Sequence, residues 1–171
     1  RMLDQPKAMP YASQPLLPDQ AAMQRPPEGT LPADTDRRGP AVVTGIAEGK
    51  FVDRIPVPVD RAMLETGRAR FETFCAPCHG VLGDGVSSVA RVMALRKPVN
   101  LHVPPASTDV VGEQFHTVRH GYGLMPSYAV QLSVDDTWAV VAYLEALRVA
   151  RHAVVADLPP DIRAYLAKEL P

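Results

Sequence analysis

The chain has 171 residues and a formal net charge of −1, with 18 Lys and Arg against 19 Asp and Glu. This balance argues against a nucleic-acid partner, because proteins of that class carry a basic face. The length suits one domain of ordinary size plus additional segments. No apolar run approaches the ~18 residues of a membrane-spanning helix.

Residues 1–59 are rich in proline and hold ten of the 18 prolines in the chain. Such a density excludes a long helix or a central strand, so we predict an extended arm over these residues. Composition alone leaves a disordered tether open. Apolar residues such as Leu16, Leu17, Val42 and Phe51 favour an arm that becomes ordered on partner subunits.

The first predicted helix begins at Asp60 and leads to the two cysteines. Asp60 can cap its N-terminus, and Leu64, Phe71 and Phe74 recur near helical spacing. Gly67 costs about 1 kcal/mol relative to alanine inside a helix. A close crossing with another helix is the expected reason for this glycine.

The only two cysteines lie in the stretch Cys75-Ala76-Pro77-Cys78-His79. This spacing is typical of covalent attachment of one c-type haem, with Cys75 and Cys78 each bonded to a vinyl group and His79 as the proximal iron ligand. A thiol redox pair would not need His79, and its strand-then-helix context is missing. A structural zinc site needs four ligands, whereas the stretch offers three.

The start of the chain bears on its compartment. It opens on Arg1 without an initiator methionine or an apolar signal region, so we expect that an export signal has been removed. Covalent haem attachment normally takes place outside the bacterial cytoplasm. The absence of other cysteines means that no disulfide framework is needed.

The segment after the motif is predicted to be a glycine-rich loop, a short helix over 89–95 and an irregular stretch that begins at Pro98. The carbonyl of Pro98 is a candidate acceptor for the free imidazole N–H of His79. Another helix is predicted over 109–120, and it carries His116 and His120 on one face. This pair offers no third metal ligand, which favours surface or haem-edge histidines.

The distal iron ligand is predicted to be Met125, which lies in a loop with the sequence Gly-Tyr-Gly-Leu-Met-Pro-Ser-Tyr over 121–128. Two glycines and a proline keep this loop out of regular structure, so the thioether can be presented to an iron. A Met opposite a His gives a six-coordinate electron-transfer haem with a raised potential. His102, His116 and His120 are the rival ligands.

The last core helix is predicted from Ser133 to about Arg148. Ser133 and Asp136 form a start resembling a capping box, and apolar residues follow at i, i+3, i+4 and i+7 from Val140. Residues 153–171 form a C-terminal tail in which one short amphipathic helix is expected.

The order of these elements resembles class I cytochrome c: a helix ending in Cys75-x-x-Cys78-His79, a loop with Met125, and a final helix with Trp138. The resemblance covers residues 60 to about 150. It implies an all-α fold with a cytochrome c domain over 60–152, in which the first and last helices cross at Gly67.

A narrower resemblance covers almost the whole chain. The motifs DQPK over 4–7, RPPEGT over 25–30, PVPV over 56–59, Arg70-Phe71 and GYGLMPSYA over 121–129 together are similar to the mono-haem cytochrome c subunit of alternative complex III. That family carries a lipid-bearing cysteine at the mature N-terminus, which would precede Arg1. Residues 31–39 depart from the family's pattern.

This resemblance implies a lipid-anchored subunit on the periplasmic side of the bacterial inner membrane, within a quinol-oxidising complex. It would take electrons from a multihaem cytochrome c and pass them to a terminal oxidase or a soluble cytochrome, with no bond chemistry of its own. The alternatives are a free periplasmic shuttle, the cytochrome subunit of a periplasmic dehydrogenase, and a sensor or peroxidase with an open iron.

Overall fold

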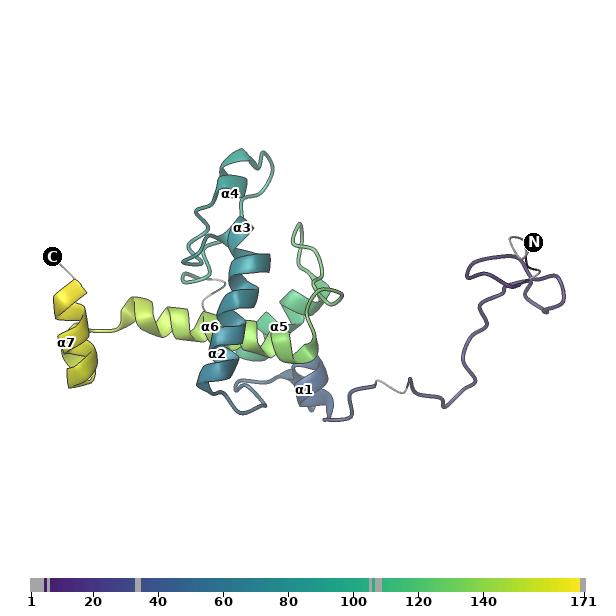
Figure 1. Ribbon diagram of the computed structural model, residues 1–171, viewed down its shortest axis with the longest axis horizontal. Helices are drawn as coiled ribbons and strands as arrows, with labels where there is room; N and C mark the ends of the chain where they lie inside the picture. Colours follow the sequence, from purple (N-terminus) through teal and green to yellow (C-terminus); the bar gives the residue numbers. More distant parts are fainter. Residues whose placement is uncertain (1–4, 6, 33–34, 105, 107–108, 170–171) are drawn as a thin grey trace. The chain divides into compact units, whose positions relative to one another are not determined.

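The computed structural model describes residues 5, 7–32, 35–104, 106 and 109–169 (Figure 1). By its internal contacts the chain divides into two units, Arg1–Asp36 and Arg37–Pro171. In the first unit, the backbone N–H of Gln14 donates to Gln20 at 2.9 Å and that of Ala22 donates to Ala12 at 3.0 Å. Residues 12–22 therefore fold back on themselves instead of running extended. Asp4, Pro6, Ala33 and Asp34, from the motifs considered above, lie outside the described residues.

The boundary of the predicted arm at residue 59 is not where the chain divides, because residues from Arg37 onward belong to the second unit. This segment forms helix α1, Pro40–Thr44, and an antiparallel hairpin of strands β1, Ile46–Ala47, and β2, Lys50–Phe51. Proline is tolerated at the first position of α1. The expectation of an extended path is therefore wrong over 40–51.

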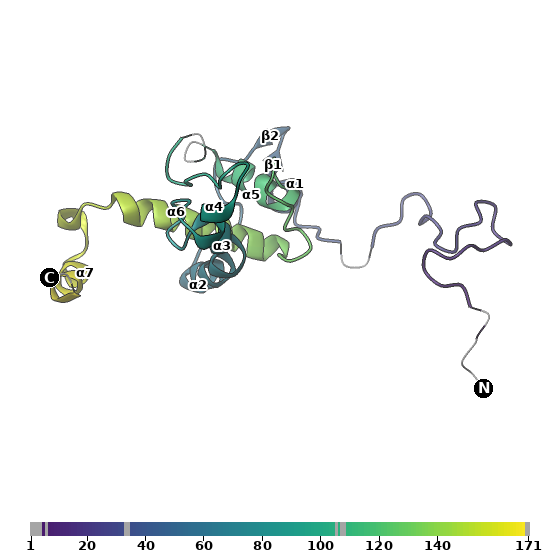
Figure 2. The same cartoon turned by 90° about the horizontal axis from the view of Figure 1, so that it is seen from above.

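The α1 segment is held by the core of the second unit. Val42 is buried against Trp138, whose indole N–H donates to the Val42 carbonyl at 2.7 Å. Trp138 also stacks on Phe115, with 4.3 Å between ring centroids. Figure 2 shows α1 and the hairpin next to α5, and the indole bond ties them to α6 as well.

Helices α2, Arg61–Arg70, and α6, Val134–His152, cross each other (Figure 1). Asp60 caps α2 by accepting from the Met63 N–H at 2.8 Å. Gly67 lies at the crossing, where a Cβ atom would come within 2.0 Å of the Ala139 carbonyl oxygen. The sequence-based explanation of Gly67 as a close helix crossing is confirmed.

The chain continues from α2 into a π-helical turn, η1, Phe71–Cys75, and then into α3, Ala76–His79. Phe71 is fully buried and packs against Tyr143 of α6, with ring centroids 5.5 Å apart. Phe71, Ala76, Leu132 and Val140 form a second buried cluster. The cysteine-bearing turns are thus fixed to α6 on the apolar side.

The remaining helices given for the described residues are α4, Ser88–Val92; α5, Val111–His120; η3, Val155–Asp157; and α7, Pro160–Glu169. The predicted all-α architecture is confirmed, since the only sheet in the described part of the chain is the short hairpin. The capping box of α6 is also confirmed, because the Asp136 N–H donates to Ser133 Oγ at 3.0 Å and Asp136 bonds back to Ser133. None of the helices in the described residues combines the length and the hydropathy of a transmembrane span.

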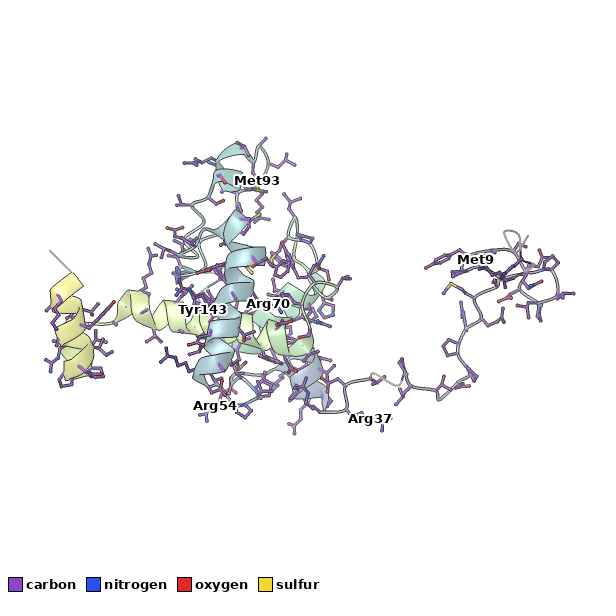
Figure 3. All side chains as sticks on the ribbon, in the orientation of Figure 1. Met9, Arg37, Arg54, Arg70, Met93 and Tyr143 are labelled. Carbon is purple, nitrogen blue, oxygen red and sulfur yellow. The ribbon has the colours of Figure 1, made fainter. Side chains whose placement is uncertain are left out.

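Asp136 also joins the two crossing helices. Its carboxylate accepts from Arg70 of α2 at 2.9 Å, and Figure 3 shows Arg70 close to this crossing. Partial burial raises the pKa of Asp136, but the hydrogen bonds from Arg70 and Ser133 outweigh this effect and lower the pKa overall. The carboxylate therefore stabilises the fold above its unfolded pKa of about 3.9 and loses that contribution as the pH falls through its lower, folded pKa.

We expect Asp136→Asn to lower the free energy of unfolding by about 1 kcal/mol at pH 7, the usual cost of losing a helix cap. The difference from the native chain should shrink below about pH 4, as measured by denaturant unfolding across a pH series. Asp135→Asn is the matched control, because the Asp135 side chain is 68% exposed and pairs with Arg38 instead of a residue of α2. A deficit in Asp136→Asn that stays constant down to pH 2 would contradict this account.

Candidate functional site

The two cysteines and the histidine share one continuous helical stretch. Cys75 is the last residue of η1, and Cys78 and His79 lie in α3. All three are half-buried. Gly80 ends the helix with φ +79°, where a Cβ atom would lie 2.6 Å from the Val86 carbonyl oxygen. The chain therefore leaves the motif through a turn that a larger side chain would obstruct.

The imidazole of His79 is oriented by a backbone bond. Its Nδ1 lies 3.1 Å from the Val99 carbonyl oxygen, which leaves Nε2 as the nitrogen available to a metal. Burial lowers the pKa of His79, and the bond to Val99 only partly opposes this effect. The net effect favours the neutral imidazole, which is the form that binds iron, and the bond to Val99 fixes the orientation of the ring.

The acceptor for His79 is Val99, so the prediction of Pro98 is wrong by one residue. The Pro98 carbonyl faces Gly85 instead. If Gly85 carried a Cβ atom, that atom would lie 2.9 Å from the Pro98 carbonyl oxygen. Gly85 has φ +79°, and its N–H donates to the His79 carbonyl at 2.7 Å. This turn brings Pro98 against Gly85 and leaves the next carbonyl for the imidazole.

The loop after the motif and the loop around residue 100 are bonded to each other. The Leu101 N–H donates to Gly83 at 2.8 Å, and His102 Nε2 lies 2.5 Å from the Leu82 carbonyl oxygen. His102 is buried and its Nδ1 has no hydrogen-bond partner. His102 thus lies in the loop that carries Val99, and its Nε2 is already engaged with the Leu82 carbonyl.

The thiols are in an apolar setting. Burial raises the pKa of Cys75 to about 12, and the neighbouring Cys78 adds to the shift. A thiol with so high a pKa is a poor nucleophile at neutral pH, which argues against thiol redox chemistry. Among the described residues, no three His, Cys, Asp or Glu side chains are placed to hold a metal ion, so the three-ligand start of a zinc site is not formed.

Met125 lies in the loop that follows α5 and is half-buried. A pair of backbone bonds at 2.9 and 3.0 Å joins it to Tyr122 in a tight turn. Gly121 begins this turn with φ +81°, where a Cβ atom would lie 2.5 Å from the Met125 carbonyl oxygen. The thioether is thus carried by a constrained loop and not by a helix.

Tyr128 connects the Met125 loop with the cysteines. It packs in the same cluster as Cys75, and its ring centroid lies 6.3 Å from that of Phe74. Burial raises the pKa of Tyr128, and the two cysteines raise it further. The predicted ligand loop and the predicted attachment site therefore meet through Tyr128, three residues after Met125.

The remaining two rival ligands lie on α5. His116 and His120 stack on each other with ring centroids 4.0 Å apart, and His116 also contacts the edge of Phe51 in the hairpin. Burial lowers the pKa of His116, and the adjacent His120 lowers it further. The two imidazoles contact each other, and His116 also contacts the hairpin. Met125 is therefore the better candidate for the distal iron ligand.

The chemistry of these residues fits a covalently attached haem. Two thiols and a neutral imidazole lie on one helical stretch, and a thioether is carried by a loop that meets it. Large apolar side chains in the same part of the chain are exposed, and a flat apolar group would cover surface of this kind: Val81, Leu82, Val86, Val99, Tyr122, Leu124 and Val130.

Sequence reasoning missed the contribution of α6 to this site. Arg148, near the C-terminal end of α6, donates to the carbonyl groups of Leu101 and Ala106. The available signal was an arginine three residues after Glu145 on the last core helix. Val99 was missed because the backbone path of its loop depends on these contacts.

The chain is similar to one protein family and to solved structures. Residues 62–144 match the model of a family described as cytochrome c oxidase, cbb3-type, subunit III. A chain of the Kuenenia stuttgartiensis reducing HAO-like protein complex is similar in structure, at 21% identity and a TM-score of 0.47. That alignment covers 63% of this chain and 54% of the other, so the chain spans about half the length of that relative. No curated protein sequence matches the chain.

Proposed function

We propose that this chain is a mono-haem subunit of a quinol-oxidising membrane complex similar to alternative complex III. The proposal starts from the cytochrome c domain over residues 62–144, because domains of this kind transfer electrons. Cys75 and Cys78 would hold one haem c covalently, and His79 and Met125 would bind its iron. The haem supplies one-electron chemistry. The protein binds it, orients His79 through Val99 and keeps water away with the cluster around Phe71.

The observation that carries the choice of a fixed subunit is the apolar surface of the first unit. Its exposed side chains include Met9, Tyr11, Leu16, Met23 and Leu31, with Tyr11 at 93% and Leu16 at 89% exposure. Figure 3 labels Met9 in this segment. A freely diffusing carrier has no use for such a surface, whereas a subunit buries it on its neighbours. The neighbours proposed are a multihaem cytochrome c as donor and a terminal oxidase or soluble cytochrome as acceptor.

We further propose a location on the periplasmic face of the inner membrane, with a lipid anchor upstream of Arg1. The subunit itself carries out no bond chemistry. An intact mass of the native protein tests the haem and the anchor together, because each adds a defined mass to the polypeptide.

The test of the assembly is detergent extraction of native membranes followed by size fractionation and a quinol-reduction assay. We expect the haem protein to migrate with a large complex and to be reduced by quinol. The double variant Leu16→Ser and Leu31→Ser should release it, since both side chains lose their apolar contacts. Val149→Ser, at a 70% exposed position of α6, is the control and should stay bound.

Other outcomes separate the alternatives. Native protein that migrates alone after extraction would identify a free shuttle. Reduction by a periplasmic enzyme without reduction by quinol would identify a dehydrogenase subunit.

A further inference from the structure

Arg148 is a charged side chain that the structure buries against a loop. Its side chain is 13% exposed. Nε and Nη2 donate to the Leu101 carbonyl oxygen at 3.2 and 3.1 Å, and Nη2 also donates to the Ala106 carbonyl oxygen at 2.7 Å. One guanidinium on α6 therefore holds two carbonyl groups that lie five residues apart in the chain.

The guanidinium is itself held in place from α5 and α6. Nη1 pairs with Glu145 at 2.5 Å, and the same carboxylate oxygen accepts from the Gln114 amide at 3.0 Å. Gln114 is buried and also donates to the Asp109 carbonyl at 2.9 Å. The network thus fixes the loop at Leu101, at Ala106 and at Asp109.

Leu101 links this network to the candidate iron ligand. Its carbonyl accepts from Arg148, while its N–H donates to Gly83 in the loop after the cysteine motif. Two residues earlier, the Val99 carbonyl lies at Nδ1 of His79. A displacement of Leu101 would therefore move both the acceptor of His79 and the partner of Gly83.

The choice of an arginine here calls for an explanation beyond stability. Apolar packing can often replace a buried ion pair without loss of stability. Carbonyl acceptors, in contrast, need a donor of fixed geometry, and the planar guanidinium supplies several donors in one rigid fork. Arg148 thus determines the path of the loop and not only the packing beneath it.

We propose that Arg148 is a positioning residue for His79: by holding the carbonyl groups of Leu101 and Ala106, it keeps the Val99 carbonyl at Nδ1 and so fixes the imidazole at the iron. This inference rests on the proposed haem ligation by His79. It assigns to the C-terminal end of α6 a role in orienting His79.

The test is the exchange rate of the His79 Nδ1 proton with solvent, followed by NMR in the reduced holoprotein. Arg148→Gln should accelerate this exchange about tenfold or more, because a hydrogen bond from a charged donor contributes at least that factor to a local opening equilibrium. If Arg148→Gln fails to fold, Arg148→Lys serves the same comparison, since lysine keeps the charge but lacks the planar fork.

Arg119→Gln is the matched control. Arg119 also donates to a backbone carbonyl, that of Leu132 at 2.7 Å, but it does so beyond the Met125 loop. We expect His79 exchange in this variant to match the native protein. The inference would be overturned if the His79 Nδ1 proton exchanged equally fast in Arg148→Gln and in the native protein. It would also be overturned if Arg148→Gln and Arg119→Gln accelerated this exchange equally at matched global stability. Native protein without a His79-ligated haem would overturn the haem assignment as well, so the two failures are distinguishable.

Discussion

Replacement of Met125 by alanine is expected to abolish the weak far-red band that arises from sulfur-to-iron charge transfer in the oxidised haem protein. The thioether is the proposed sixth ligand, and alanine offers no donor atom in its place. The vacated position should then bind carbon monoxide readily in the reduced protein at neutral pH, whereas the native protein should resist it. Absorption spectra of both oxidation states measure the two effects.

Met93→Ala is the matched control for this prediction. Met93, which Figure 3 labels, is also half-buried and follows the cysteine motif, but it is the residue directly after α4. The control should keep the far-red band. Survival of the band in Met125→Ala would mean that another side chain binds the iron. Ready binding of carbon monoxide by the native protein would point instead to a sensor or peroxidase.

Gly67→Ala should destabilise the protein by about 3 kcal/mol or more, measured as the free energy of unfolding in denaturant. The new methyl carbon would lie 2.0 Å from the Ala139 carbonyl oxygen and 3.0 Å from Tyr143 Cβ. The nearest of these atoms is backbone, so the helices themselves must separate, and such overpacking costs more than a side-chain adjustment. Helix propensity alone predicts the opposite sign, a gain of about 1 kcal/mol.

The reverse exchange two residues later provides the control. Ala69 is exposed on the same helix, so Ala69→Gly should cost only the propensity difference of about 1 kcal/mol. Equal stability of Gly67→Ala and native protein would show that α2 and α6 can move apart without cost. The cysteine-bearing turns, which continue from α2, would then be less firmly fixed to α6 than their packing indicates.

Local signals in the sequence were sufficient for the helices that frame the site. Asp60 marks the start of α2, and Ser133 with Asp136 marks the start of α6, because a capping side chain acts on backbone groups only a few residues away. The glycine at position 67 was also interpretable, since its cost inside a helix needs a compensating contact. The motif at 75–79 indicated the haem by its spacing alone.

Contacts between distant segments could not be predicted in the same way. The Val42 carbonyl receives the Trp138 indole across 96 positions of sequence, and no periodicity in the proline-rich segment indicates it. The bonds from Arg148 to Leu101 and Ala106 depend on the tertiary path of an irregular loop. For this reason the sequence pointed to Pro98, and not Val99, as the acceptor of His79. It likewise placed residues 40–51 in the extended arm, although they form α1 and the hairpin.

The indole bond between Trp138 and Val42 also has a mechanical consequence. Any tension that the first unit transmits enters the second at Arg37 and meets α1 and Trp138 first, in the cluster with Phe115. The cysteine motif packs in the other cluster, around Phe71 and Leu132. We therefore expect a pull on the arm to act on the cluster around Trp138 before it reaches the turns that carry the cysteines and His79.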